Sequence, residues 1–147
     1  GVDYKKAKEL TFKQLYGGVF EQFKDLEFFK KVQVYVDEMW AKFNQEGYVE
    51  CPISKYRYEK SKLEEMKPQK LLNYILQNLE TAMNIRILWD IFKSLKGRKT
   101  KLVLYTYDSF LFDFSEEDKD LINEIKAIFE KNKLKIKESY GSNYNFK

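Results

Sequence analysis

The chain has 147 residues, of which 44% are hydrophobic, 34% charged and 17% aromatic, and its formal net charge is +4. This composition excludes a disordered chain, because burial of so much apolar surface can offset the entropy lost on folding. Histidine is absent and Cys51 is the one cysteine. A Ser-His-Asp hydrolase, a histidine-ligated zinc site and a disulfide within the chain are therefore excluded.

The N-terminal part of the sequence predicts helices. Apolar residues recur at helical spacing over 5–16, and Gly17 and Gly18 end this helix because glycine readily adopts the backbone angles of a helix terminus. We expect a short helix around 19–25. Residues 28–45 carry a broad apolar stripe and predict a longer helix whose stripe packs in the core.

The remaining sequence alternates between hairpins and helices. Residues 48–59 predict a β-hairpin, and 69–94 predict a helix that is apolar on most of its surface and therefore largely buried. Residues 101–114 predict two adjacent strands joined by an acidic turn.

Ser115 is expected to cap a helix at 116–132, whose first residues are acidic. The alternating residues 133–146 predict a final strand. We therefore expect an α+β fold of one compact unit, with helices packed on antiparallel β-hairpins.

No apolar run approaches the roughly 18 residues of a membrane span, and the first residues lack the apolar core of a signal peptide. We expect a cytoplasmic protein that does not contact a membrane.

Asp108 is the first candidate for chemistry. It lies in the apolar sequence VLYTYDSFLF, where an ionised carboxylate is costly unless it is compensated. At the tip of a hairpin it could hold a divalent metal for phosphoryl transfer. Taken alone, an ordinary turn aspartate is the commoner explanation.

Lys8, Phe12 and Tyr16 are spaced i, i+4, i+8 and share one face of the first helix. The lysine could meet a triphosphate, and the aromatic rings could stack on a sugar and a base. Taken alone, an amphipathic helix with a solvated lysine is the commoner explanation.

Asn73 and Gln77 are also spaced i, i+4, on the apolar helix at 69–94. Their amides could meet acceptors in the minor groove of DNA, or they could be satisfied within an internal hydrogen-bond network.

Together these segments resemble the family A DNA polymerases, of the bacterial DNA polymerase I type. The resemblance runs through essentially the whole chain, and its motifs follow in the order and spacing of that family. KAKELTFKQLYGG resembles motif B, and KVQVYVDEMWAKFNQEGYVE resembles the helix and hairpin that follow it. NYILQ resembles the Asn-x3-Gln element, YDS resembles motif C, and KIKESYGSNY resembles the terminal strand.

The resemblance implies a role for each matching residue. Lys8 would grip the phosphates of the incoming deoxynucleoside triphosphate, Phe12 would lie against its sugar and base, and Tyr16 would stack with the template as the finger helix closes, next to Gly17. Asn73, Gln77 and Tyr107 would contact primer–template DNA. Asp108 would hold the catalytic Mg²⁺ of a two-metal mechanism.

The resemblance has departures. Tyr4 stands where the family has a basic residue, Tyr107 replaces the histidine of motif C, and Ser109 replaces its glutamate. We expect a divergent, phage-like branch, in a bacterial or virus-infected cell.

Motif A, with the other metal-binding aspartate, precedes motif B in this family, and only Gly1–Val2–Asp3 precede it here. The resemblance therefore implies the C-terminal portion of a polymerase, with fingers at about 1–46 and palm at about 47–147, that needs an upstream portion. Both a truncated sequence and a separately encoded half fit. The alternatives are a non-catalytic nucleic-acid-binding module on the same fold and a helical interaction protein with no nucleic-acid role.

Overall fold

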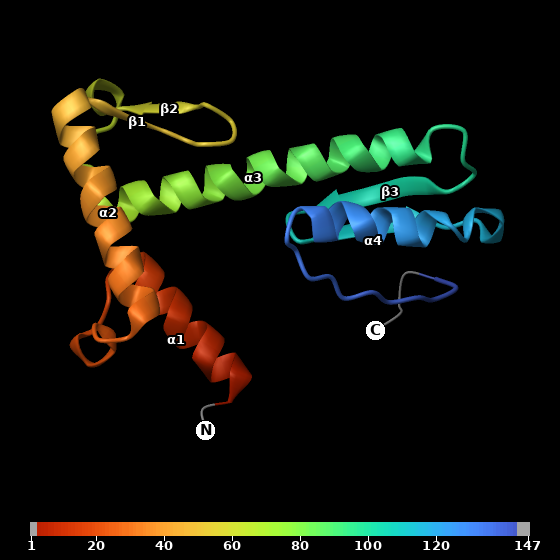
Figure 1. Ribbon diagram of the computed structural model, residues 1–147, viewed down its shortest axis with the longest axis horizontal. Coiled ribbons are helices and arrows are strands. Elements are labelled where there is room, and N and C mark those ends of the chain that lie inside the picture. Colours follow the sequence, from red (N-terminus) through yellow and green to blue (C-terminus); the bar gives the residue numbers. More distant parts are fainter. Residues whose placement is uncertain (1–2, 144–147) are drawn as a thin grey trace. The chain divides into compact units, whose positions relative to one another are not determined.

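The computed structural model describes residues 3–143 and has the expected α+β fold (Figure 1). The α-helices of these residues are α1 (Tyr4–Gly17), α2 (Glu27–Glu46), α3 (Pro68–Leu95) and α4 (Leu121–Lys131). Antiparallel hairpins are formed by β1 (Tyr48–Glu50) with β2 (Arg57–Glu59), and by β3 (Lys101–Thr106) with β4 (Ser109–Asp113). Short 3₁₀-helices are η1 (Glu21–Phe23), η2 (Lys60–Lys62) and η3 (Glu116–Asp118).

The chain divides into two compact units, Gly1–Ala82 and Met83–Lys147, and α3 contributes to both. The division into fingers at about 1–46 and palm at about 47–147 is a different one and stays a prediction. Among the described residues, no helix combines the length and apolarity that crossing a bilayer requires.

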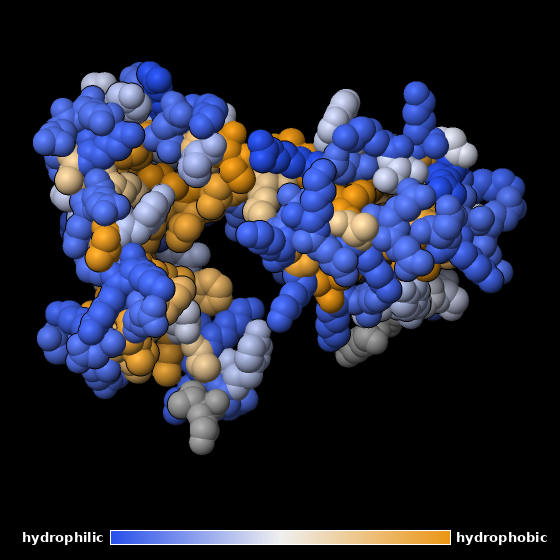
Figure 2. Space-filling model, viewed as in Figure 1, coloured by the Kyte–Doolittle hydropathy of each residue, from blue (hydrophilic) through white to orange (hydrophobic). Residues whose placement is uncertain are grey.

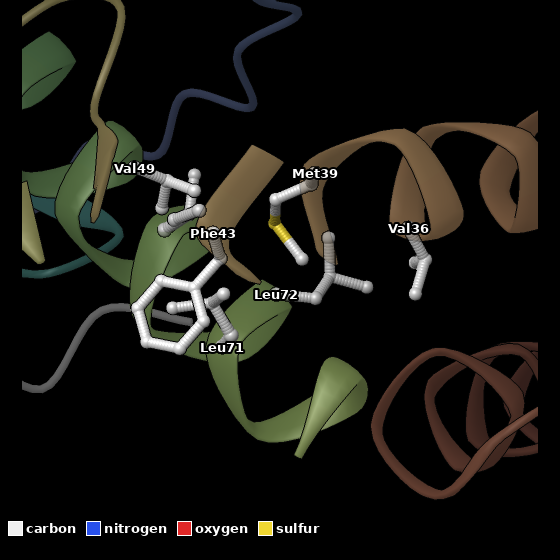
Figure 3. Packing of buried hydrophobic residues seen from close by; sticks show 7 residues of the cluster. Val36, Met39, Phe43, Val49, Leu71 and Leu72 are labelled. Atoms are coloured by element: carbon white, nitrogen blue, oxygen red, sulfur yellow. The ribbon is translucent and has the colours of Figure 1, made fainter. Parts of the chain in front are cut away.

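The core of the N-terminal unit forms between α2, α3 and β1 (Figure 3). The spacing of the apolar residues on α2 puts them on one helix face, which packs against the start of α3. The buried side chains are Val36, Met39 and Phe43 of α2, Leu71, Leu72 and Ile75 of α3, and Val49 of β1. Gly47, with a φ of 77°, ends α2 and turns the chain directly into β1, so the first hairpin lies beside this core.

In the C-terminal unit, the β3–β4 hairpin packs against α4 through aromatic rings. Phe110 contacts Phe129 edge to face, with ring centroids 5.3 Å apart, and Tyr105 lies 5.0 Å from Phe110 across the hairpin. The register shifts between Leu102 and Leu104, which indicates a bulge near the start of β3.

A buried carboxylate fixes the open end of this hairpin. Asp118 accepts hydrogen bonds from the backbone N–H of Lys99 (2.9 Å), from the backbone N–H of Thr100 (2.7 Å) and from the Thr100 hydroxyl (2.8 Å). The Thr100 Oγ1 in turn accepts from the backbone N–H of Ser115 (3.0 Å). These hydrogen bonds, with the Thr100 backbone bond the largest cause, lower the pKa of Asp118 below its ordinary value of 3.8.

Replacing Thr100 with valine should lower the free energy of unfolding by about 1–3 kcal/mol, because a buried carboxylate oxygen and the Ser115 N–H lose a partner while the shape is kept. Urea unfolding measures this change.

Since the pKa of Asp118 is lowered in the folded state, its contribution to the free energy of unfolding is present above about pH 3.8 and is lost as the pH falls through the pKa of the folded state. Asp118→Asn should therefore reduce the loss of stability on acidification below about pH 4. An unchanged acid transition in Asp118→Asn would contradict this assignment.

The expected helix at 116–132 is wrong at its start. Residues 116–118 form η3, α4 begins at Leu121, and the Ser115 side chain makes no capping hydrogen bond. The reason is tertiary: the carboxylate of Asp118 is held by the start of β3, so the turn carrying it does not continue into the helix.

The expected strand at 133–146 is also wrong over residues 133–143, and residues 144–146 lie outside the described range. The segment returns along α4 instead of pairing with a strand. The Leu134 N–H donates to the Phe129 carbonyl (3.0 Å), and Glu138 pairs with Lys126 at 2.7 Å.

Helix α3 has the expected position but is not largely buried. Ile85, Trp89 and Phe92 are 59%, 66% and 55% exposed. In the space-filling view, hydrophobic residues are visible at the surface among hydrophilic ones (Figure 2). The short helix expected at 19–25 is reduced to the 3₁₀ turn η1.

Candidate functional site

Helix α1 carries the first part of the candidate site. The Phe12 and Tyr16 rings are stacked, with centroids 5.8 Å apart and planes 6° from parallel, and Lys8 Nζ lies 5.9 Å from the Phe12 centroid. Phe12 and Tyr16 are 43% and 44% exposed, and Lys8 is exposed. The three side chains therefore form one accessible cationic and aromatic surface, which we call the α1 stripe.

The opposite side of α1 is held by Gln14, which is buried. Its Oε1 accepts a hydrogen bond from the Phe20 backbone N–H, and this contact closes the loop after Gly17 and Gly18. Gly18 has a φ of 95°, so a side chain there would be strained. Gly17 is exposed, and a Cβ on it would meet no described atom within 4 Å. The end of the α1 stripe is thus open.

Asn73 and Gln77 lie near the start of α3 and have different surroundings. Asn73 Oδ1 is buried and has no hydrogen-bond partner among residues 3–143. Gln77 is exposed and lines a hollow of about 370 Å³ together with Tyr58, Tyr74 and two further polar residues, Asn78 and Thr81. The two amides therefore differ in exposure, and their contact with DNA stays a prediction.

Tyr58 of β2 and Tyr74 of α3 form one wall of this hollow. The Tyr58 hydroxyl donates to the Tyr74 carbonyl at 3.0 Å, and their rings stack with centroids 6.0 Å apart. Burial is the main cause that raises the pKa of Tyr58. Sequence reasoning did not single out Tyr58 and Tyr74 as a pair, because a contact between β2 and α3 has no local signal.

Asp108 lies in the tight turn of the β3–β4 hairpin. Thr106 is paired with Ser109 in the strand register, and their hydroxyls are hydrogen bonded, so Tyr107 and Asp108 form the tip. Tyr107 is 79% exposed and Asp108 is also exposed. The carboxylate is therefore solvated, and the desolvation that the apolar flanking sequence suggested does not arise.

Asn84 of α3 anchors this tip. Its Nδ2 donates a hydrogen bond of 2.9 Å to the Tyr107 carbonyl, and the side chain is only 9% exposed. This contact fixes the backbone of the residue that precedes Asp108. Sequence reasoning missed Asn84, although an asparagine in an otherwise apolar part of the helix was a signal for a buried hydrogen bond.

Replacing Asn84 with leucine keeps the approximate size of the side chain and removes the donor. We expect a loss of about 1–3 kcal/mol in the free energy of unfolding, since the Tyr107 carbonyl loses its partner. Amide hydrogen exchange at the turn should become faster as well. Thr81→Val on the same helix is the control, because the Thr81 hydroxyl only donates to the carbonyl of Gln77 one turn earlier. Equal exchange rates in both variants would contradict an anchoring role.

Asp108 is not part of a cluster of acidic groups: residues 3–143 contain no group of three or more His, Cys, Asp or Glu side chains placed to hold a metal. Asp113, the nearest acidic residue along β4, lies opposite Lys101 in the strand register, at the other end of the hairpin. One carboxylate is nonetheless a usable ligand, because Mg²⁺ is commonly bound by one or two carboxylates together with water and substrate phosphates.

The predicted residues fall into both units. The α1 stripe with Asn73 and Gln77 belongs to the N-terminal unit, and Tyr107 with Asp108 belongs to the C-terminal unit.

Comparison with known proteins adds one structural similarity. No protein-family model matches the sequence, and no curated protein matches it. The fold is similar to the POL domain of Pol1 from M. smegmatis, solved in complex with DNA primer-template and dNTP, with a TM-score of 0.70 and 17% sequence identity. The match covers 84% of this chain and 26% of that chain. The chain therefore has the fold of part of a DNA polymerase domain.

Proposed function

We propose that this chain is the C-terminal part of a DNA-directed DNA polymerase and takes part in template-directed nucleotidyl transfer. The observation that carries the proposal is the similarity of fold to a polymerase domain over 84% of the chain. That domain was solved with primer-template DNA and a dNTP, which supports the same classes of partner here. The family A resemblance of the separate sequence motifs adds to this support.

In this proposal the α1 stripe binds the incoming deoxynucleoside triphosphate. Lys8 is an exposed point charge suited to phosphate oxygens, and Phe12 beside it offers a ring face to the sugar and base. Tyr16 continues the stack at the end of the helix, where Gly17 leaves room for a template base.

Asp108 supplies one ligand to Mg²⁺, which when bound activates the primer 3′-hydroxyl and neutralises charge on the phosphates. The exposed tip gives this carboxylate access to solvent and to substrate, and Asn84 holds the tip in place. The other metal-binding aspartate comes from an upstream polymerase portion.

The exposed amide of Gln77 and the exposed ring of Tyr107 contact primer–template DNA in this proposal. Asn73 is assigned the same role, and the unpartnered oxygen of its amide would gain a partner if the start of α3 rearranged on binding.

A non-catalytic nucleic-acid-binding module is the second candidate. The specific observation that favours it is Ser109, which stands where the family has an acidic residue and whose hydroxyl bonds to Thr106. Such a protein would keep the α1 stripe for DNA while Asp108 had no role.

DNA binding separates both candidates from a protein with no nucleic-acid role. Titration of the chain with primer–template DNA at increasing salt should show an affinity that falls steeply, because each phosphate contact contributes a slope of about −0.9 in log K against log salt. Binding that is weak and indifferent to salt would contradict both candidates.

A further inference from the structure

A hollow in the C-terminal unit lies outside the candidate site. It has a volume of about 460 Å³ and is lined by Ile85, Arg86, Trp89 and Asp90 of α3 and by Lys131 and Asn132 at the end of α4. The hollow is open to solvent, since Ile85, Arg86 and Trp89 are all exposed.

The hollow contains an exposed aromatic ring. Trp89 is 66% exposed and Ile85, one turn earlier on the same helix face, is 59% exposed. Such exposure of a large indole is costly in water, and it leaves the ring available to a flat partner. Every nucleic-acid base has a π-face, so stacking on such a ring does not depend on sequence.

The charge of the hollow favours an anionic partner. Arg86 and Lys131 supply cations from two different helices. The one acidic residue in the lining, Asp90, is paired with Lys93 at 2.6 Å. The hydrogen bond from Lys93 is the main cause that lowers the pKa of Asp90, and the charge of Lys131 contributes to the same shift. Asp90 is therefore ionised, and its charge is balanced by Lys93, so Arg86 and Lys131 leave the lining with excess positive charge.

We propose that this hollow binds single-stranded nucleic acid, with one base stacked on Trp89 and the adjoining phosphates held by Arg86 and Lys131. The combination of a stacking platform and flanking cations is the chemistry that recognises single strands without reading their sequence. This site goes beyond the nucleotide and metal positions of the proposed polymerase function and does not depend on them.

The test is titration of the full chain with a short oligothymidylate, followed by tryptophan fluorescence. Trp40, the other tryptophan, is stacked on Phe43 beside the core of the N-terminal unit, so quenching should come from Trp89. Trp89→Ala should weaken binding about tenfold, the usual effect of losing one stacked base. Trp89→Phe should abolish the quenching and retain part of the affinity.

Phe92→Ala is the matched control, since Phe92 is a similarly exposed aromatic residue on α3 that does not line the hollow. Arg86→Gln and Lys131→Gln should each make the salt dependence shallower by about 0.7, the value for one phosphate contact with a single strand. Lys24→Gln and Lys31→Gln remove equal charge from lysines already paired with Glu21 and Glu27 and should change little.

Unchanged oligothymidylate affinity in Trp89→Ala would overturn the proposal. So would equal losses in Trp89→Ala and Phe92→Ala accompanied by reduced self-association in sedimentation, because the exposed face of α3 would then be a protein interface. This test is independent of the proposed polymerase function. The loss of oligothymidylate binding in Trp89→Ala is measured without primer extension, and Asp108→Ala should leave oligothymidylate binding intact.

Discussion

Asp108→Ala is expected to reduce primer extension by the assembled polymerase about a thousandfold or more, while its affinity for primer–template DNA stays nearly unchanged. A metal ion that stabilises transition-state charge contributes several kcal/mol, and each 1.4 kcal/mol corresponds to about a factor of ten in rate. The variant should fold normally, since Asp108 is exposed and lies in the turn of the hairpin. Single-turnover extension with Mg²⁺ and all four nucleotides measures the effect.

Asp113→Ala is the matched control for this prediction. It removes the same group from the same hairpin, at the end where β4 faces Lys101, and should leave extension close to that of the unaltered chain. Extension that survives in Asp108→Ala would contradict the metal-binding role. DNA binding together with no extension by the assembled polymerase that carries the unaltered chain would favour the non-catalytic module.

Lys8→Ala is expected to lower kcat/KM for the incoming nucleotide by about tenfold to a hundredfold. A hydrogen bond to a charged group contributes about 1.5–3 kcal/mol, and phosphate oxygens would lose that contact. The loss should appear in the nucleotide titration and not in the affinity for DNA. Steady-state extension at varied nucleotide concentration provides the measurement.

Lys13→Ala provides the comparison on the same helix. Lys13 is paired with Glu9 at 3.2 Å and lies five residues from Lys8, away from the α1 stripe. Equal effects of the two substitutions would mean that kcat/KM depends only on the net charge of the helix, and the specific role of Lys8 would be wrong.

Most elements could be predicted from the sequence because their signals are local. The periodicity of 28–45 predicted α2, and the glycines at 17–18 correctly marked the end of α1. The start of α4 could not be predicted, because the hydrogen bonds that hold Asp118 come from residues 18 and 19 positions earlier in the chain. The prediction of a strand at 133–146 failed for a related reason: the alternating residues fit a strand, but the segment contacts α4 instead of another strand.

In the candidate site, too, the features that depend on local spacing could be predicted and those that depend on tertiary contacts could not. A spacing of i, i+4, i+8 was enough to place Lys8, Phe12 and Tyr16 on one face, and the structure has their side chains adjacent. Helical spacing alone was not enough for Asn73 and Gln77, because burial at α3 depends on what packs around the helix. The contact of Asn84 with the Tyr107 carbonyl, 23 residues away, has no local signal that names its partner.

Reconstitution tests whether this chain is a portion of a DNA polymerase. Primer extension is measured on a primed DNA template with Mg²⁺, by this chain alone and by this chain with an upstream polymerase portion that carries the second metal-binding aspartate. We predict no extension by the chain alone and extension by the combination, lost in Asp108→Ala. If the two portions bind each other and bind DNA but do not extend the primer, the chain is not a polymerase portion. Extension by the chain alone would contradict its need for an upstream partner.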